Sequence, residues 1–183
     1  LNANTGEQVV GSPISTDVGT ADTPSGLAHL AAWADYPNND NTALRVYGGD
    51  LLGNLWRITL PTSSAPTPSV QLLVVLKDAQ SNAQPITARP ELAMVKKSTR
   101  TPAPSLILIG TGALLGDTDM STKTQQSFYG ILDTLGTTSG ALYTDLRSLT
   151  SSFVTQTMET GICPADATNC TPGLPMFYIS ETH

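Results

Sequence analysis

The stretch LRVYGGDLLGNLWRITL, residues 44–60, decides the fold class of this chain. Its second half alternates apolar and polar residues from Trp56 to Leu60, which is the period-2 pattern of a half-buried strand. The Gly-Gly-Asp and Gly-Asn groups between the two apolar runs tolerate the positive φ that a hairpin turn requires. The stretch therefore predicts two antiparallel strands joined by a tight turn, with Trp56 in the core and Arg57 on the polar face.

Similar strand-like runs recur along the chain, separated by stretches rich in turn-forming residues. Many short strands without long amphipathic helices favour a sandwich, a barrel or a propeller segment. One helical turn is expected at 143–149. The expected strands are 8–10, 27–33, 44–47, 55–60, 70–76, 91–96, 106–109, 127–132, 152–158 and 177–180.

An internal echo favours the propeller among these classes. Val46–Gly53 resembles Leu108–Gly116, and each follows an apolar strand. Thr5-Gly6-Glu7 resembles the Thr-Gly turn of quinoprotein-type blades. We therefore predict an all-β fold, a quinoprotein-like β-propeller segment of antiparallel blades. Residues 1–183 would form a single region of about three blades, which is a fragment of a larger ring or a ring with one edge open to a partner.

Composition excludes several functional classes. The 183 residues carry a net charge of −6, which argues against nucleic acid or an anionic membrane as the main partner. Only 13% of the residues are charged, a profile typical of an exported β protein rich in turns. No apolar run reaches the length of about 18 to 20 residues that spans a bilayer.

Because the sequence opens at Leu1 without an initiator Met or a signal peptide, we expect a processed segment.

The two cysteines, Cys163 and Cys170, are separated by a short polar spacer that contains Pro164. A loop of this length can close as a disulfide, and we predict that bond. The alternative is two free thiols in a reducing compartment. A metal site is not expected there, because neither His29 nor His183 lies close in sequence.

Four motifs follow one another in order along the chain: YGGDLLGNLWR at 47–57, QPITARPEL at 84–92, IGTG at 109–112 and TQQSFYGILD at 124–133. A fifth segment, Pro24–Ala28, lies upstream of them. Together these segments resemble the C-terminal β-propeller of PilY-type proteins, the type IV pilus tip-associated adhesins and assembly factors. The resemblance covers about residues 20–135.

The resemblance implies an exported, non-enzymatic protein at the pilus tip, the cell surface, or the outer membrane and periplasm. Such a protein primes pilus assembly, opposes retraction and contributes to adhesion and twitching motility. Its implied partners are pilin or minor pilin subunits and a host or abiotic surface, with no nucleic acid and no membrane span.

The resemblance also implies a calcium-binding loop before the Tyr-x-Gly-Asp turn, here Asp35–Leu44. Asn38 and Asp40 fall on ligand positions, and the carbonyl of Thr42 would add a third oxygen. Asp35 is one residue out of register, and Leu44 replaces the last aspartate. Because calcium takes about six to eight oxygens, we expect a weak or lost site; a polar turn capped by its own Asn and Asp side chains is the other reading.

Other candidate residues have structural interpretations. Asp50 is expected to accept backbone hydrogen bonds across the hairpin, and His29 to be a satisfied histidine on an apolar run. Asp117 and Asp119 are expected to form either an acidic turn or a cation site. Trp33 is expected either to pack in the core or to form part of a carbohydrate-binding platform. The further candidates are a glycine turn at 110–112, which lacks a P-loop lysine, and a basic cluster of Lys96, Lys97 and Arg100.

Two other functions remain as alternatives. A quinoprotein-like dehydrogenase shares the propeller class, but the chain has few aromatic residues (5%) and no adjacent cysteine pair to stack on a quinone. A structural propeller fragment without independent function is the second alternative. It would leave exposed sheet edges that dimerise or aggregate.

Overall fold

The computed structural model describes residues 4–8, 11, 13–95, 105–144, 158–162 and 175–179. The described part is all-β, with one short 3-10 helix, and every strand pair is antiparallel, as the sequence predicts. The elements are β1 (Leu30–Trp33), β2 (Arg45–Gly49), β3 (Asn54–Thr59), β4 (Ser69–Val75), β5 (Glu91–Met94), β6 (Ser105–Gly110), η1 (Asp117–Ser121), β7 (Phe128–Asp133), β8 (Met158–Ile162) and β9 (Pro175–Ile179).

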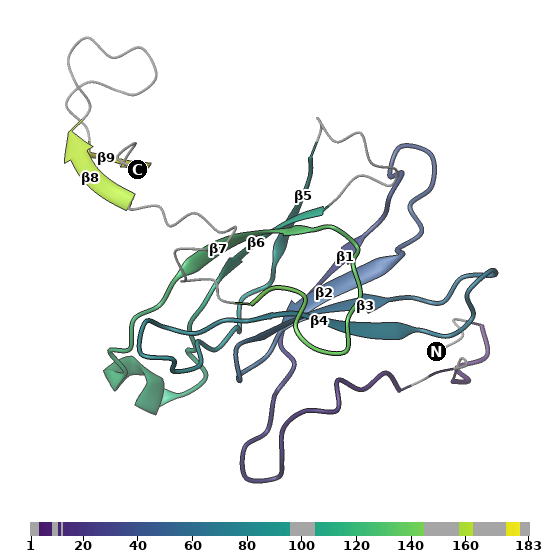
Figure 1. Cartoon of the computed structure of the whole chain (residues 1–183), viewed down its shortest axis with the longest axis horizontal. Coiled ribbons are helices and arrows are strands. Elements are labelled where there is room, and N and C mark those ends of the chain that lie inside the picture. Colours follow the sequence, from purple (N-terminus) through teal and green to yellow (C-terminus); the bar gives the residue numbers. More distant parts are fainter. Residues whose placement is uncertain are drawn as a thin grey trace. The chain divides into compact units, whose positions relative to one another are not determined.

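The chain divides into two compact units, residues 1–144 and 145–183. The first unit holds a four-stranded sheet in the order β1-β2-β3-β4 and a three-stranded sheet in the order β5-β6-β7 (Figure 1). Both sheets are simple meanders of strands that are consecutive in sequence. The second unit holds the β8–β9 hairpin.

In the four-stranded sheet, β3 is buried on both faces. The register pairs Tyr47 with Arg57 and Arg57 with Gln71, so these three side chains share one face of the pleat. Trp56 is 5% exposed on the opposite face, which confirms its expected place in the core. The expectation that Arg57 lies on the polar face of a half-buried strand is wrong, because its side chain is 4% exposed and forms an ion pair with Asp133 of the second sheet.

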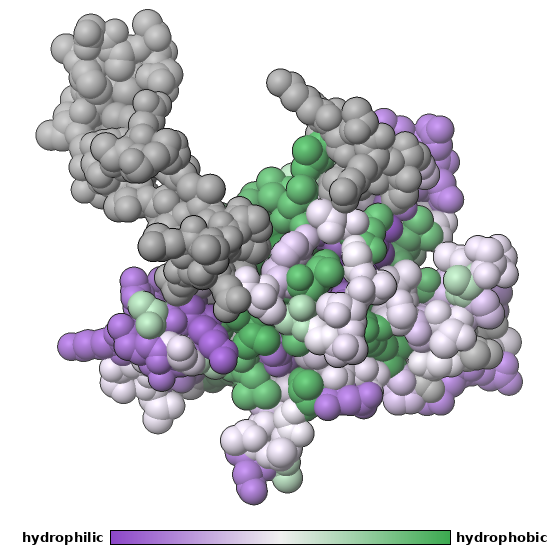
Figure 2. Space-filling view, in the orientation of Figure 1, coloured by the Kyte–Doolittle hydropathy of each residue, from purple (hydrophilic) through white to green (hydrophobic). Residues whose placement is uncertain are grey.

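In the three-stranded sheet, the two faces differ in burial. Ile107, Ile109 and Ile131 lie on the buried face, each at most 1% exposed. On the other face Phe128 and Leu132 are 68% and 40% exposed. The sheet therefore has an apolar core face and a second apolar face that other described residues leave partly open. Figure 2 shows hydrophobic residues gathered along the strands and hydrophilic residues around η1.

Two turns at one end of the four-stranded sheet have the same hydrogen-bond pattern. Asp50 Oδ1 accepts the amides of Leu52 and Asn54, and its Oδ2 accepts Asn54 Nδ2, all at 2.9 Å. Asp78 repeats this pattern with Gln80 and Asn82. Each turn also has a positive φ at its fourth residue, 80° at Gly53 and 68° at Ser81. The first turn confirms the structural role predicted for Asp50, whereas the second was not anticipated.

The internal echo falls on equivalent strands, since Val46–Gly53 covers the end of β2 and Leu108–Gly116 covers the end of β6. These are the second strands of their sheets. The expected helical turn at 143–149 is not helical at 143 and 144, and its remaining positions lie outside the described residues.

Candidate functional site

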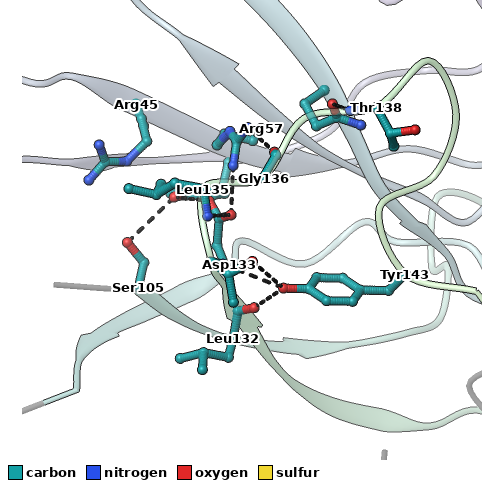
Figure 3. Close-up of polar contacts among 12 residues, drawn as sticks. Arg45, Arg57, Ser105, Leu132, Asp133, Leu135, Gly136, Thr138 and Tyr143 are labelled. Atoms are coloured by element: carbon teal, nitrogen blue, oxygen red, sulfur yellow. Dashed lines mark hydrogen bonds and ion pairs between the residues drawn. The ribbon is translucent and has the colours of Figure 1, made fainter. Parts of the chain in front are cut away.

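The polar centre of the first unit is the carboxylate of Asp133, at the end of β7, which is 0% exposed (Figure 3). Arg57 Nη1 from β3 lies 2.6 Å from Asp133 Oδ1 and forms an ion pair with it. The hydroxyl of Tyr47 on β2 donates to Asp133 Oδ2 at 2.7 Å. The amide of Leu135 donates to Oδ1 at 2.9 Å. Asp133 therefore joins the two sheets through a charged and hydrogen-bonded contact.

The ionisable side chains of this cluster interact with one another, since Arg57 and Tyr47 both contact the carboxylate of Asp133. Burial, followed by the negative charge of Asp133, raises the pKa of the Tyr47 phenol well above its usual value, so the residue stays protonated as a donor. Arg57 Nη2 donates to the carbonyl of Gly136 at 2.7 Å. A buried carboxylate that is paired and fully hydrogen-bonded is a structural crosslink whose rupture is costly.

The segment after β7 returns along β4 and is fixed there by the side chain of Gln71. Gln71 Nε2 donates to the carbonyl of Gly140, and Gln71 Oε1 accepts the amide of Thr138, both at 2.8 Å. The amides of Leu142 and Tyr143 donate to the carbonyls of Leu72 and Leu73 on β4. Figure 3 shows this return with Gly136, Thr138 and Tyr143 labelled. One edge of the four-stranded sheet is thereby covered.

A second polar junction between the sheets is centred on Gln84, which is 1% exposed. Its Nε2 donates to the carbonyl of Gln125 and to the hydroxyl of Ser127, at 2.8 and 3.0 Å. The hydroxyl of Tyr129 on β7 donates to Gln84 Oε1 at 2.8 Å. Both polar groups of the Gln84 side chain thus have hydrogen-bond partners, whereas in the Asp133 cluster the buried Arg57 Nε has none among the described residues.

The predicted calcium loop is closed by its own hydrogen bonds. Asp35 accepts Trp33 Nε1 at 2.9 Å and forms an ion pair with Arg45 at the start of β2. Asp40 Oδ1 accepts the amide of Thr42 at 2.8 Å. Hydrogen bonding by the side chain of Thr42, followed by this backbone hydrogen bond, lowers the pKa of Asp40. Asn38 lies in the same turn and is exposed. The structure thus places Asp35, Asn38, Asp40 and Thr42 on one loop but engages Asp35 with a cationic side chain.

The structure also describes the other residues that the sequence singled out as candidates, one tryptophan, one histidine and two aspartates. Trp33 is 8% exposed, so it belongs to the core. His29 is exposed, which corrects the expectation of a satisfied histidine in an apolar run: the residue lies just before β1. Asp119 Oδ2 accepts the amides of Leu115 and Gly116, so Asp117 and Asp119 form an acidic turn. Among the described residues, no group of three or more His, Cys, Asp or Glu could hold a metal ion.

Two sets of predicted residues lie outside the described part of the chain. They are the cysteines Cys163 and Cys170 and the basic cluster Lys96, Lys97 and Arg100. The disulfide therefore stays a prediction.

The buried crosslink itself was missed by sequence reasoning. Arg57 occupies a polar position of an alternating strand, where an exposed side chain is the usual case. A weak signal was present, because Asp133 closes the apolar run FYGIL at 128–132 and aspartate is disfavoured inside strands. Pairing these two residues required the register of both sheets.

Two known proteins are similar to this chain over more than half of its length. A type IV pilus biogenesis factor PilY1 homolog from Xylella fastidiosa (strain Temecula1 / ATCC 700964) is 37% identical over 109 residues, which are 60% of this chain. The crystal structure of the Pseudomonas aeruginosa PilY1 C-terminal domain matches 63% of this chain with a TM-score of 0.50 and 27% sequence identity. The chain is similar to part of a PilY1-type protein. No family model matches the sequence.

The resemblance to PilY-type proteins inferred from the motifs is thereby confirmed. The similarity is partial in the other direction: this chain spans 8% of the Xylella fastidiosa PilY1 homolog and 27% of the Pseudomonas aeruginosa chain. Among the residues that the model describes, no helix is both long and apolar enough to cross a membrane.

Proposed function

We propose that this chain is a non-enzymatic module of an exported protein that takes part in type IV pilus biogenesis. The observation that carries this function is the similarity to the PilY1 homolog, at 37% identity over 109 residues. The structural similarity to the PilY1 C-terminal domain, with a TM-score of 0.50 over 63% of this chain, also supports it.

The internal chemistry of the unit agrees with a binding or assembly role. The carboxylate of Asp133 and the side-chain amide of Gln84 are each engaged by neighbouring protein groups. Ser105 is 0% exposed and has the Tyr47 hydroxyl at 3.4 Å, so it is not presented to a substrate. A rigid body of this kind positions surface loops for recognition. The partners we propose are pilin or minor pilin subunits, and adhesion to a surface and twitching motility are the processes served at the pilus tip.

We further propose that the two sheets of the first unit are neighbouring blades of a β-propeller. Two features support this arrangement. One face of the β5-β6-β7 sheet meets the β1-β4 sheet through Tyr47, Arg57 and Asp133. The other face carries exposed Phe128 and Leu132, as a blade with a further neighbour would.

A genetic experiment tests the pilus function. The codons for residues 13–144 are deleted in frame in the organism that encodes the chain, and surface pili are quantified by shearing and immunoblotting for pilin. We expect few surface pili and lost twitching, both restored by the wild-type gene. The same deletion in a retraction-deficient background separates two roles: pili that return indicate opposition to retraction, whereas pili that stay absent indicate a role in assembly. Normal piliation and motility in the deletion strain would contradict the function.

A further inference from the structure

The loop between β1 and β2, residues 35–44, is the segment where the family resemblance implies a calcium ion, and Arg45, the first residue of β2, forms an ion pair with its first residue, Asp35. The side chains of Asp35 and Arg45 are 7% and 8% exposed, so both charges are buried. Arg45 Nη1 lies 3.3 Å from Asp35 Oδ2, and Arg45 Nη2 contacts Asp35 Oδ1. Trp33 Nε1 is the third donor to this carboxylate and lies 2.9 Å from Asp35 Oδ1.

These donors leave Asp35 poorly suited to bind a cation. Both of its oxygens already accept N–H groups, and two of the three bonds come from a guanidinium. A calcium ion at this carboxylate would have to lie beside that charge or displace it. Burial alone would lower the pKa of Arg45, but the hydrogen bond to Asp35, followed by the electrostatic interactions with Tyr47 and with Asp35, outweighs burial and raises the pKa. Arg45 therefore stays cationic beside Asp35 across the physiological range.

Two further oxygens of the loop, the carbonyl of Tyr36 and Oδ1 of Asp40, are also engaged. The carbonyl of Tyr36 accepts the amides of Asn39 and Asp40, at 2.9 and 2.8 Å. Asp40 Oδ1 accepts the amide of Thr42, and Leu44, at the last expected ligand position, brings no side-chain oxygen. The amide of Leu44 closes the loop on the carbonyl of Trp33 at 2.8 Å. The residues present thus do not fit a site that needs about six to eight oxygens.

We propose that the Arg45 guanidinium is the resident cation of this loop: by pairing with Asp35 it holds residues 35–44 between β1 and β2 and makes their conformation independent of calcium. Where the PilY-type resemblance implies a loop set by a metal ion, this chain has a loop set by a strand residue. This role of Arg45 concerns the fold of the loop and holds whether or not the chain serves pili.

Thermal unfolding and calcium binding of the purified 183-residue chain test the role of Arg45. The wild-type Tm is expected to be the same in millimolar calcium and in chelator, with no saturable heat on calorimetric titration with calcium chloride. Terbium, excited through Trp33, is expected to give no saturable luminescence. Arg45→Met is expected to lower the Tm by about 5 to 10 °C under both conditions, because it leaves Asp35 buried and unpaired.

Three further variants keep the test decisive. Asp35→Asn in the Arg45→Met background should recover part of the lost Tm, because it removes the unpaired charge. Arg45→Lys retains the charge without the planar fork, so it should give a smaller fall if Arg45→Met does not fold. Asp40→Asn, at an exposed ligand position, should leave the Tm nearly unchanged. Two results would overturn the assignment. One is calcium binding to the wild type that gives a saturable heat, raises the Tm and is lost in Asp40→Asn. The other is an unchanged Tm in both Arg45 variants. No readout involves piliation, so failure here is distinct from failure of the pilus function.

Discussion

Arg57 and Asp133, 76 positions apart in sequence, meet at 2.6 Å between the two sheets of the first unit, with both side chains nearly inaccessible to solvent. Neither residue belongs to a motif for catalysis or metal binding. Their pairing joins the four-stranded and the three-stranded sheets, together with the Tyr47–Asp133 hydrogen bond and the Gln84 junction, since the strands of the two sheets do not hydrogen-bond to each other along their edges.

A double-mutant cycle measures this pair. Arg57→Met is expected to reduce the free energy of unfolding by about 3 to 5 kcal/mol, because Asp133 is left charged and buried. The double variant Arg57→Met/Asp133→Asn should be more stable than Arg57→Met alone, since the unpaired charge is gone. Urea unfolding of the wild type, of Arg57→Met, of Asp133→Asn and of the double variant, followed by tryptophan fluorescence, gives the four free energies of the cycle. Strictly additive losses would show that the two side chains do not interact.

The raised pKa of Tyr47 predicts a loss of stability at alkaline pH. In the unfolded chain a tyrosine loses its proton near pH 10, whereas in the folded chain Tyr47 keeps it. The stabilising contribution is therefore complete below about pH 10 and declines above it, by at most about 1.4 kcal/mol per pH unit. Urea unfolding from neutral to alkaline pH should show a steeper decline for the wild type than for Tyr47→Phe. Parallel profiles would contradict the assignment.

Trp56 is predicted to be a principal core residue of β3. Trp56→Ala should destabilise the fold by about 3 to 5 kcal/mol, because it empties a buried aromatic site. Trp56→Phe is the control: it keeps most of the volume but leaves Asp50 Oδ2 without the Trp56 Nε1 donor, now at 2.9 Å. We expect that change to lower the free energy of unfolding by about 1 to 3 kcal/mol. A loss below about 1 kcal/mol for the alanine variant would show that the site is not a packed core position.

The paired Asp-x-x-x-Asn turns predict opposite responses at their fourth residues. Ser81 has a φ of 68°, which glycine adopts more readily, so Ser81→Gly should stabilise the fold by about 0.5 to 1 kcal/mol. Gly53→Ser should destabilise it strongly, since a Cβ there would lie 2.6 Å from the carbonyl of Leu76. Differential scanning calorimetry of both variants measures this contrast. A lower Tm for Ser81→Gly would contradict the equivalence of the two turns.

The cysteines provide a prediction independent of these sheets. Cys163 and Cys170 should be oxidised to a disulfide in protein isolated from the exported fraction, because their short polar spacer suits a closed loop. A thiol assay under denaturing conditions should find no free sulfhydryl before reduction and two after it. Two free sulfhydryls before reduction would dispose of the bond.

The strands and the hairpin turn were predictable because their signals are local. Alternation from Trp56 to Leu60 and the Gly-Asn turn depend only on neighbouring residues. The Ser81 turn was missed because serine, unlike glycine, rarely adopts a positive φ and so does not indicate such a turn. Asp78 and Asn82 nevertheless repeat the spacing of Asp50 and Asn54. A search for that spacing would have found it.

The burial of Arg57 could not be predicted for a different reason. Period-2 alternation identifies the two faces of a strand but not whether a second layer covers the polar face. Here Asp133 and the return segment at Gly136 cover it. Likewise, the carboxylate of Asp35 looked like a misplaced ligand until the register of β1 and β2 brought Arg45 beside it.

Detection of this protein on pili tests the central claim most directly. Pili are sheared from intact cells, purified, and probed with an antibody against residues 13–144, with a pilin-deletion strain as the control. A pilus biogenesis role at the tip predicts a signal in the sheared fraction of the wild type, far below the amount of pilin, and its loss from that fraction in the pilin-deletion strain. Equal signal in both strains, or its restriction to the cytosol, would contradict the account.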